Sequence, residues 1–116
     1  AALFAAHHGL DNLIAIVDYN KLQGFGRTSD VLELEPLADK WRAFGWETLE
    51  VDGNDVADLT NVLNNIQPFT SRPTSIIAHT VKGKGVSFME NRLEWHYMTP
   101  SKEQLRDALI ELDRKA

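Results

Sequence analysis

Three short β-rich runs alternate with helical patterns along these 116 residues, and this alternation constrains the fold more than any other feature. The runs cover residues 13–18, 46–51 and 75–80. Runs of Ile and Val with few polar interruptions are typical of strands buried on both faces, as in a parallel sheet. Helices that connect such strands pack on the sheet as right-handed crossovers. The sequence therefore predicts an α/β fold, with a parallel sheet and helices on both faces.

Three helices have readable ends or apolar stripes. Pro36 suits the first turn of one helix, and Gly45 suits its end. The next helix is expected to begin at Asn54 or Asp55, and the last at Ser101, with a glutamine three residues later that completes a capping box. The apolar side chains expected on the buried faces are, in chain order, Leu37, Trp41 and Phe44; Leu59, Val62, Leu63 and Ile66; and Leu105, Ala108, Leu109 and Leu112.

Composition excludes several classes of function. The net charge of −5 comes without a basic stripe, which argues against a nucleic-acid partner. The absence of cysteine excludes disulfides, thiolate catalysis and cysteine-based zinc sites, and it fits a reducing compartment. No apolar run is long enough to cross a bilayer, and the first residues lack the basic and apolar pattern of a signal peptide. We therefore expect a cytoplasmic protein without a membrane partner.

The first six residues, from Ala1 to Ala6, have the composition of the middle of a helix. Neither a starting Met nor a capping residue precedes them. We therefore expect the polypeptide to extend further toward its N-terminus.

Two long connections follow strands, over residues 21–33 and 82–100. Open α/β sheets bind ligands in loops outside the carboxyl ends of their strands, so we expect the functional residues in these two segments. Asn20 and Leu22 stand at the exit of the first strand. A side-chain amide oxygen and a main-chain carbonyl two residues later can occupy neighbouring positions around Mg²⁺. Alternatively, Asp18 and Asn20 only shape the turn after the strand.

The segment from Leu10 to Gln23 reads LDNLIAIVDYNKLQ, and it closely resembles the second half of the thiamine-diphosphate motif of transketolases. That motif opens with Gly-Asp-Gly and closes at an Asn. Further similar segments follow in the family's order, namely AFGW at 43–46, VDG at 51–53, AHTVKGKG at 78–85 and WH at 95–96. Several separate segments in order are more specific than one motif, and together they cover essentially the whole chain.

The resemblance implies a thiamine-diphosphate site with a divalent metal, Mg²⁺ or Ca²⁺. Asn20 would contribute its side-chain oxygen to the metal and Leu22 its main-chain oxygen, and the metal would bridge the diphosphate. The family's acidic metal ligand belongs to the Gly-Asp-Gly element, which would precede Ala1. Residues 1–116 are thus expected to be the C-terminal portion of the diphosphate-binding domain, inactive when alone.

Lys82 stands in the second long connection, within the sequence Lys-Gly-Lys-Gly. Glycine lets the backbone approach a ligand closely, and lysine can neutralise phosphate charge. Taken alone, this segment is equally consistent with a flexible basic turn. The resemblance places Lys82 in the cofactor site, whereas Lys84 is expected to face solvent.

His96 follows Trp95, and a lone histidine in such a setting is often a packing residue. The resemblance implies a second role close to the diphosphate and the substrate, where His96 helps to hold the sugar and assists proton movement. An imidazole that titrates near pH 6.5 suits either task. The chain departs from the family at Tyr97 and Met98, because transketolases usually have Gly after this histidine. The acceptor pocket, and with it the choice of sugar, could therefore differ.

The implied activity is that of a transketolase, which transfers a two-carbon ketol unit from a ketose phosphate to an aldose phosphate. The protein contributes placement and electrostatics, and the cofactor supplies the carbanion chemistry. Activation of the cofactor in this family depends on a Glu of the pyrimidine-binding domain, to which no acid of this chain corresponds. Some transketolases are split into two polypeptides, and this chain resembles the first. The expected partners are a second copy and a pyrimidine-binding domain or subunit, in a homodimer or heterotetramer.

Three alternatives remain at this stage. The chain could be a non-catalytic assembly or binding module of the same fold, or part of an enzyme similar to deoxyxylulose-phosphate synthase. A Rossmann-type nucleotide domain is a weaker alternative, because no Gly-x-Gly-x-x-Gly follows the first strand.

Overall fold

The computed structural model describes residues 1–67 and 70–114, and they form two compact units. The first unit contains residues 1–19 and 33–80, and the second contains residues 20–32 and the segment that begins at Val81. The expected range of 1–116 also includes residues 68, 69, 115 and 116, which lie outside the described residues.

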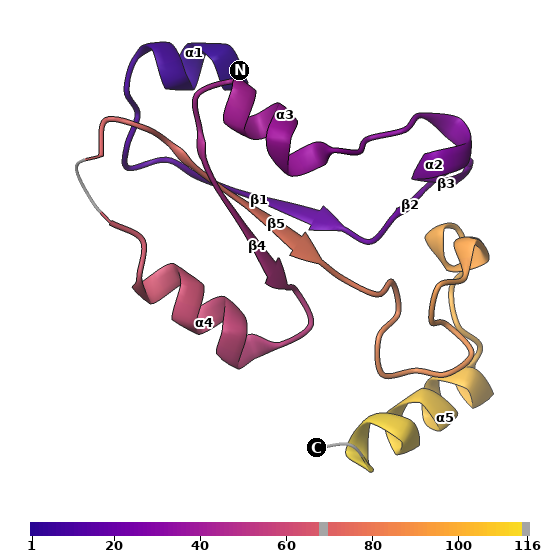
Figure 1. Ribbon diagram of the computed structural model, residues 1–116. Coiled ribbons are helices and arrows are strands. Elements are labelled where there is room, and N and C mark those ends of the chain that lie inside the picture. The colour runs from indigo at the N-terminus through magenta and orange to yellow at the C-terminus, as the bar shows by residue number, and fades with distance from the viewer. Residues whose placement is uncertain (68–69, 115–116) are drawn as a thin grey trace. The chain divides into compact units, whose positions relative to one another are not determined.

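The first unit contains a parallel three-stranded sheet in the order β1-β5-β4 (Figure 1). Its elements are α1 (Ala2–His7), β1 (Ile14–Tyr19), α3 (Leu37–Ala43), β4 (Glu47–Asp52), α4 (Val56–Asn64) and β5 (Thr74–His79). Ile76 of the central strand is in register with Ile16 on one side and Leu49 on the other. The expected strands are confirmed, with each boundary shifted by one residue. The parallel α/β fold is confirmed as well.

Helices cover both faces of this sheet, as Figure 1 shows for α3 and α4. On the α3 face, Tyr19, Ala38 and Ile77 form a buried cluster with Trp41 and other apolar side chains against it. On the α4 face, the buried residues are Val51, Ile76 and Ala78, and the side chains packed against them are Leu59, Val62 and Ile66. The alternation of side chains along each strand therefore produces two separate apolar layers.

Trp46 connects α1 to the α3 side of the sheet. Its side chain is 4% exposed and meets Trp41 edge-on, with ring centroids 4.9 Å apart. Its indole Nε1 donates a hydrogen bond to the carbonyl oxygen of Ala2 at 3.0 Å. Trp41 and Trp46 are therefore core aromatics, as the sequence suggested.

Four side chains that we expected to be buried are exposed in the first unit. Phe44 follows the last residue of α3, where Gly45, with φ +89°, turns the chain out of the helix. Leu63 lies outside the narrower stripe with which α4 contacts the sheet. Ile14 and Ile16 belong to the edge strand β1, and Ile16 is 55% exposed. The expectation of burial on both faces was wrong for β1, because α4 packs against β4 and β5.

The second unit contains β2 (Leu22–Gln23), β3 (Gly26–Arg27), α2 (Thr28–Val31), the 3₁₀ helix η1 (Leu93–His96) and α5 (Lys102–Asp113). β2 and β3 form a small antiparallel hairpin. The segment 21–33 is therefore not an irregular loop, as we had expected. The capping box of α5 is confirmed, because the Ser101 hydroxyl accepts from the Gln104 N–H and the Gln104 side chain accepts from the Ser101 N–H.

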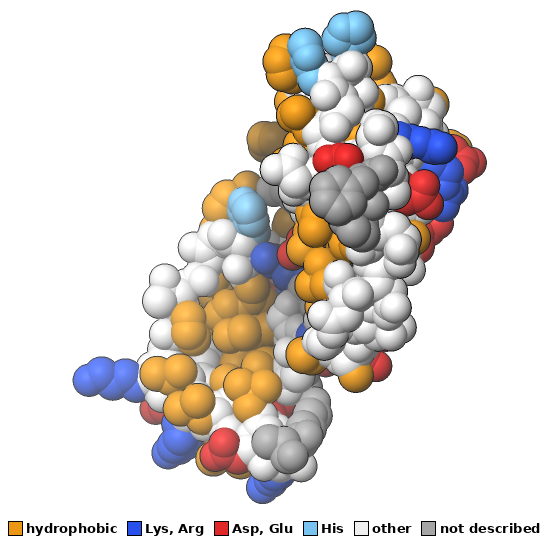
Figure 2. Space-filling view, turned by 90° about the vertical axis from the view of Figure 1, so that its left-hand side faces the viewer, with side chains coloured by type: hydrophobic (Ala, Val, Ile, Leu, Met, Phe, Trp, Pro, Cys, Tyr) orange, Lys and Arg blue, Asp and Glu red, His pale blue; other side chains and the backbone are white. Residues whose placement is uncertain are grey.

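Exposed hydrophobic side chains are frequent on both units (Figure 2). In α5, Ala108 is buried, whereas Leu105, Leu109 and Leu112 are exposed, contrary to the expected stripe. α5 contacts the preceding segment mainly through polar groups, because the Glu111 carboxylate accepts from both the N–H and the hydroxyl of Ser87 at 2.7 Å. Over residues 1–67 and 70–114, no helix has the length and hydropathy that crossing a membrane requires.

Candidate functional site

A pocket of about 120 Å³ lies within the second unit. Its lining residues are Asn20, Leu22, Gln23, Lys82, Leu93 and His96. All four residues that we singled out from the sequence, Asn20, Leu22, Lys82 and His96, are thus brought together. They come from two segments that are separated by some fifty residues of the first unit.

The turn between Asn20 and Leu22 depends on Lys21, whose φ of +63° lies in the left-handed region. The Leu22 N–H donates to the Asn20 side-chain oxygen at 2.9 Å. Asn20 therefore shapes the turn, whereas Asp18 accepts a hydrogen bond from the Thr80 hydroxyl. An amide oxygen has two lone pairs, so Asn20 retains one for a further partner.

The carbonyl of Leu22 lies on the same side of β2 as its N–H. Thr28 donates its N–H to the Lys21 carbonyl at 3.0 Å, which makes these two residues a hydrogen-bonded pair of the hairpin. Because such pairs alternate along an antiparallel ladder, the next pair, Leu22 with Arg27, does not exchange hydrogen bonds. The N–H and C=O of Leu22 are therefore directed away from β3, toward the side on which Asn20 accepts.

The Lys-Gly-Lys-Gly segment is an ordered turn. Gly83 has φ +72°, and a Cβ there would lie 2.7 Å from the Met89 carbonyl oxygen, so only glycine fits. Asn91 donates its N–H to the Lys82 carbonyl at 2.9 Å, which closes the loop behind Lys82. The interpretation as a flexible turn was wrong. Lys84 is exposed, as expected, and Lys82 is partly buried in the pocket lining.

His96 is the last residue of η1, and its side chain is exposed at the pocket. Trp95 holds this helix, because its Nε1 donates to the Phe88 carbonyl at 2.9 Å and its ring packs on Phe88 at a centroid distance of 5.4 Å. Trp95 therefore supplies the packing that a His-Trp pair suggests, and the His96 imidazole is left available at the surface.

The lining of the pocket suits a phosphate group. The Lys82 ammonium and the His96 imidazole can donate to an anion, and the amide groups of Asn20 and Gln23 can donate or accept. Two neutral oxygens, from Asn20 and Leu22, can serve a hard cation whose remaining ligands come from a phosphate or another segment. None of the described lining residues carries a carboxylate. The part of the chain that the structure describes holds no group of three His, Asp or Glu fit for a metal.

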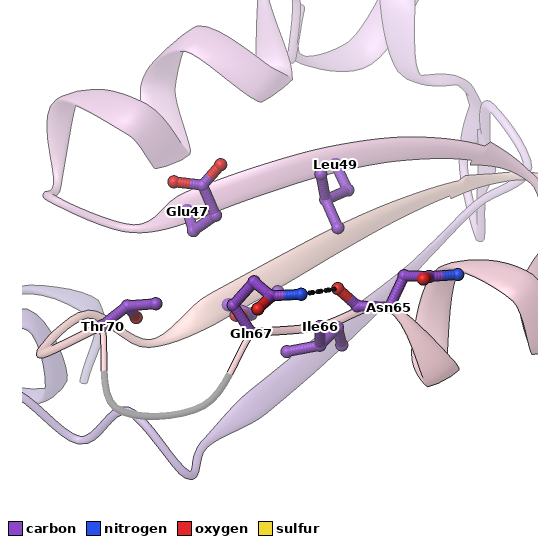
Figure 3. A pocket seen from close by; sticks show the side chains of 7 residues that line it. Glu47, Leu49, Asn65, Ile66, Gln67 and Thr70 are labelled. Atoms are coloured by element: carbon purple, nitrogen blue, oxygen red, sulfur yellow. Dashed lines mark hydrogen bonds between the residues drawn. The ribbon is translucent and has the colours of Figure 1, made fainter.

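A larger pocket, of about 300 Å³, lies in the first unit under the chain that follows α4 (Figure 3). Glu47 and Thr74, the first residues of β4 and β5, line it, so it lies at the amino ends of these strands. Gln67 closes one side by donating to the Asn65 carbonyl at 3.1 Å. Ligands of parallel sheets bind at the opposite, carboxyl ends, and no residue singled out from the sequence lines this pocket. The smaller pocket is therefore the candidate site.

Comparison with known families decides what kind of domain this is. The family described as "Transketolase, thiamine diphosphate binding domain" matches residues 1–112. The chain belongs to the transketolase family. The match confirms the family resemblance that the sequence motifs indicated, and it establishes thiamine diphosphate binding as the property of the domain family.

Two curated transketolase relatives are similar over nearly the whole chain. One of the two subunits of an apulose-4-phosphate transketolase from Actinobacillus succinogenes is 49% identical over 97% of the chain and 40% of its own length. The "6-deoxy-6-sulfo-D-fructose transketolase subunit SqwG" of Clostridium sp. strain MSTE9 is 41% identical over 99% of the chain and 42% of its own length. The chain thus spans about two fifths of these relatives.

The fold is also that of a solved transketolase. The crystal structure of the enzyme from Campylobacter jejuni superposes with a TM-score of 0.71 over 98% of this chain and 22% of that one, at 22% identity. At this identity the likeness concerns the fold alone, and it confirms the transketolase architecture of the parallel sheet.

Two pocket residues were missed by reasoning from the sequence. Gln23 closes the quoted motif, so its position beside Leu22 was a signal that we did not use. Leu93 carries no chemical signal, because an aliphatic side chain in a long connection is ordinary. Only the fold brings Leu93 to the pocket.

Proposed function

We propose that residues 1–116 are the C-terminal portion of the diphosphate-binding domain of a transketolase, which transfers a two-carbon ketol unit from a ketose to an aldose acceptor. The observation that carries the proposal is the pocket in which Asn20, Leu22, Lys82 and His96 meet. Their correspondence to the family motif is a property of the sequence and does not depend on the geometry. Their convergence on one pocket supports a common ligand.

The proposed metal ligands are the Asn20 side-chain oxygen and the Leu22 main-chain oxygen. Their shared side of β2, together with the lone pair that remains on Asn20, supports this role. Mg²⁺ and Ca²⁺ both prefer oxygen ligands, and Mg²⁺ takes several of its ligands from phosphates and water. The metal site of this chain is therefore completed by the diphosphate and by an acidic ligand from another segment.

Lys82 is proposed to bind the diphosphate. Its partly buried ammonium at the pocket can offset phosphate charge, and the glycine after it brings the backbone close. His96 is proposed to hold the sugar and to donate or accept a proton at its oxygen atoms, because the imidazole is exposed at the pocket mouth. When bound, thiamine diphosphate supplies the carbanion chemistry of the reaction.

A pyrimidine-binding subunit is the proposed partner, in a homodimer of whole chains or a heterotetramer of split ones. Both curated relatives are named as transketolase subunits, which supports a split enzyme. Their printed substrates, apulose 4-phosphate and 6-deoxy-6-sulfo-D-fructose, differ from each other. The proposal therefore covers the two-carbon transfer between sugars and not one particular sugar pair.

A second candidate function is a non-catalytic assembly module of the same fold. The observation that favours it is the lack of a carboxylate among the described residues that line the pocket. Such a module would bind its partner subunit and would neither bind the cofactor nor transfer ketol units.

Titration calorimetry on the full-length protein, mixed with its partner subunit, separates these two functions. We expect thiamine diphosphate to bind in the presence of Mg²⁺ or Ca²⁺, and to lose nearly all of its affinity after chelation, because the metal links the diphosphate to Asn20 and Leu22. Equal affinity with and without the metal would contradict the proposed site. Complete absence of binding in a correctly assembled complex would favour the assembly module.

A further inference from the structure

Tyr97, the residue after His96, makes a contact that connects the two segments of the pocket. Its hydroxyl donates a hydrogen bond to the Gly24 carbonyl oxygen at 2.8 Å. Gly24 directly follows β2, whose residues Leu22 and Gln23 line the pocket, and His96 lines it from η1. One hydrogen bond therefore joins the hairpin to the helix that carries the imidazole, and all of these residues belong to the second unit.

The rings of Tyr97 and His96 are also in contact. They meet edge-on at an interplanar angle of 87°, with centroids 4.7 Å apart. This is the geometry that aromatic pairs prefer. Tyr97 thus restricts the imidazole from one side, while its hydroxyl is anchored on the hairpin.

Gly24 gives this arrangement the space it needs. A Cβ at Gly24 would lie 2.8 Å from the Tyr97 hydroxyl and 3.7 Å from His96 Nε2. The φ of Gly24 is not in the left-handed region, so the reason for glycine here is space and not backbone conformation. Residues 24, 96 and 97 therefore interlock.

Packing does not account for the side chain of Tyr97. It is 69% exposed, so its ring contributes little to an apolar core. The backbone of η1 has other attachments, because Trp95 is hydrogen-bonded to Phe88 and the Tyr97 N–H donates to the Glu94 carbonyl. Loss of the Tyr97 hydroxyl should therefore leave η1 folded and release only the contact beside His96.

We propose that Tyr97 is a positioning residue for His96. Its hydrogen bond to Gly24 and its edge-on ring contact fix the imidazole against the β2–β3 hairpin, at the pocket. The effect on turnover rests on the function proposed above, in which His96 acts on the sugar. The restriction of the imidazole itself does not depend on that function.

The test uses the full-length protein in complex with its partner subunit, and two variants that break the same contact from opposite sides. Tyr97→Phe removes the hydroxyl and keeps the ring. Gly24→Ala keeps the tyrosine and places a Cβ where the hydroxyl lies. Met98→Ala, at the neighbouring exposed position, is the matched control.

The first readout is the rate at which diethyl pyrocarbonate modifies His96, measured by peptide mass spectrometry. We expect both variants to raise this rate about three- to tenfold, the scale of losing one ordinary hydrogen bond, and Met98→Ala to leave it unchanged. An unchanged rate in both variants would overturn the inference, whatever their activity.

The second readout is steady-state kinetics of the two-carbon transfer. Tyr97→Phe is expected to lower kcat about three- to tenfold, with little change in KM for the cofactor, and to have no further effect in a His96→Ala background, because Tyr97 acts through His96. An equal loss in that background would overturn the inference, since Tyr97 would then act independently. A faster modification of His96 with unchanged kcat would retain the positioning role and reject the catalytic role proposed for His96.

Discussion

The side-chain oxygen of Asn20 illustrates how a structural and a functional role can occupy one atom. It accepts the Leu22 N–H at 2.9 Å, and this bond orients the Leu22 carbonyl toward the same side. The turn that Asn20 shapes is therefore not an alternative to metal binding, because it is the arrangement that would place two oxygens beside one cation. The second lone pair of the amide oxygen remains for the metal.

Asn20→Ala and His96→Ala are predicted to affect different kinetic constants. Asn20→Ala removes a proposed metal ligand, so it should weaken thiamine diphosphate binding at least about tenfold. His96→Ala removes a group proposed to move a proton at the sugar, so it should mainly lower kcat, by about a hundredfold. Calorimetry of the cofactor and steady-state kinetics of the full assembly measure the two effects.

Asn20→Asp serves as the control, because it keeps an oxygen at the same position and should retain cofactor binding. If His96→Ala weakened the cofactor more than Asn20→Ala did, the proposed roles of the two residues would have to be exchanged.

The residues of the pocket were predictable to different degrees. Asn20, Leu22, Lys82 and His96 could be named because the chain resembles a family motif, whereas their spacing alone left routine turn and packing interpretations open. Tyr97 was noticed as a departure from the family, but its bond to Gly24 joins residues that are far apart in the sequence. No local pattern encodes such a contact.

At the scale of elements, the strands and caps followed from local physics. Continuous β-branched runs predicted β1, β4 and β5 to within one residue, and Asp55 caps α4 by accepting from two backbone N–H groups. The hairpin β2–β3 was missed, because strands of two residues are too short to show a period of two. Its cue was the Gly24-Phe25 loop with glycine at both ends of the turn.

Burial was less predictable than periodicity. The stripe of α5 has the expected spacing, yet Leu105 and Leu109 are exposed, as are Ile14 and Ile16 of β1. A hydrophobic period states which side chains share a face of a helix or strand. Whether another element covers that face depends on the tertiary arrangement, which a local pattern does not contain.

Ser101→Ala tests the cap of α5. Without the hydroxyl, the Gln104 N–H loses its acceptor, and the first turn should open more often, at a cost of about 1 kcal/mol. Hydrogen exchange of the Gln104 amide in the full-length protein is therefore expected to become several times faster.

Ser101→Asp should restore slow exchange at this amide, since aspartate caps helices equally well. Thr99→Ala, which removes a hydroxyl just outside the helix, is the matched control and should change nothing. Equally fast exchange in Ser101→Ala and Thr99→Ala would show that the cap contributes no stability.

At the scale of the whole molecule, the chain covers about two fifths of its curated relatives, and the pocket reflects this. Its described lining offers an ammonium, an imidazole and neutral oxygens, and no carboxylate. A divalent cation held by two neutral oxygens needs anionic ligands from elsewhere. The charge of the site therefore agrees with a domain that shares its active site with other segments.

The most direct measurement is a crystal structure of the full-length assembly with thiamine diphosphate and Ca²⁺, in which the anomalous signal locates the cation. We predict that the Asn20 side-chain oxygen and the Leu22 carbonyl oxygen both lie about 2.3–2.6 Å from Ca²⁺. A cation bound beneath the diphosphate with either of these oxygens directed away from it would contradict the account.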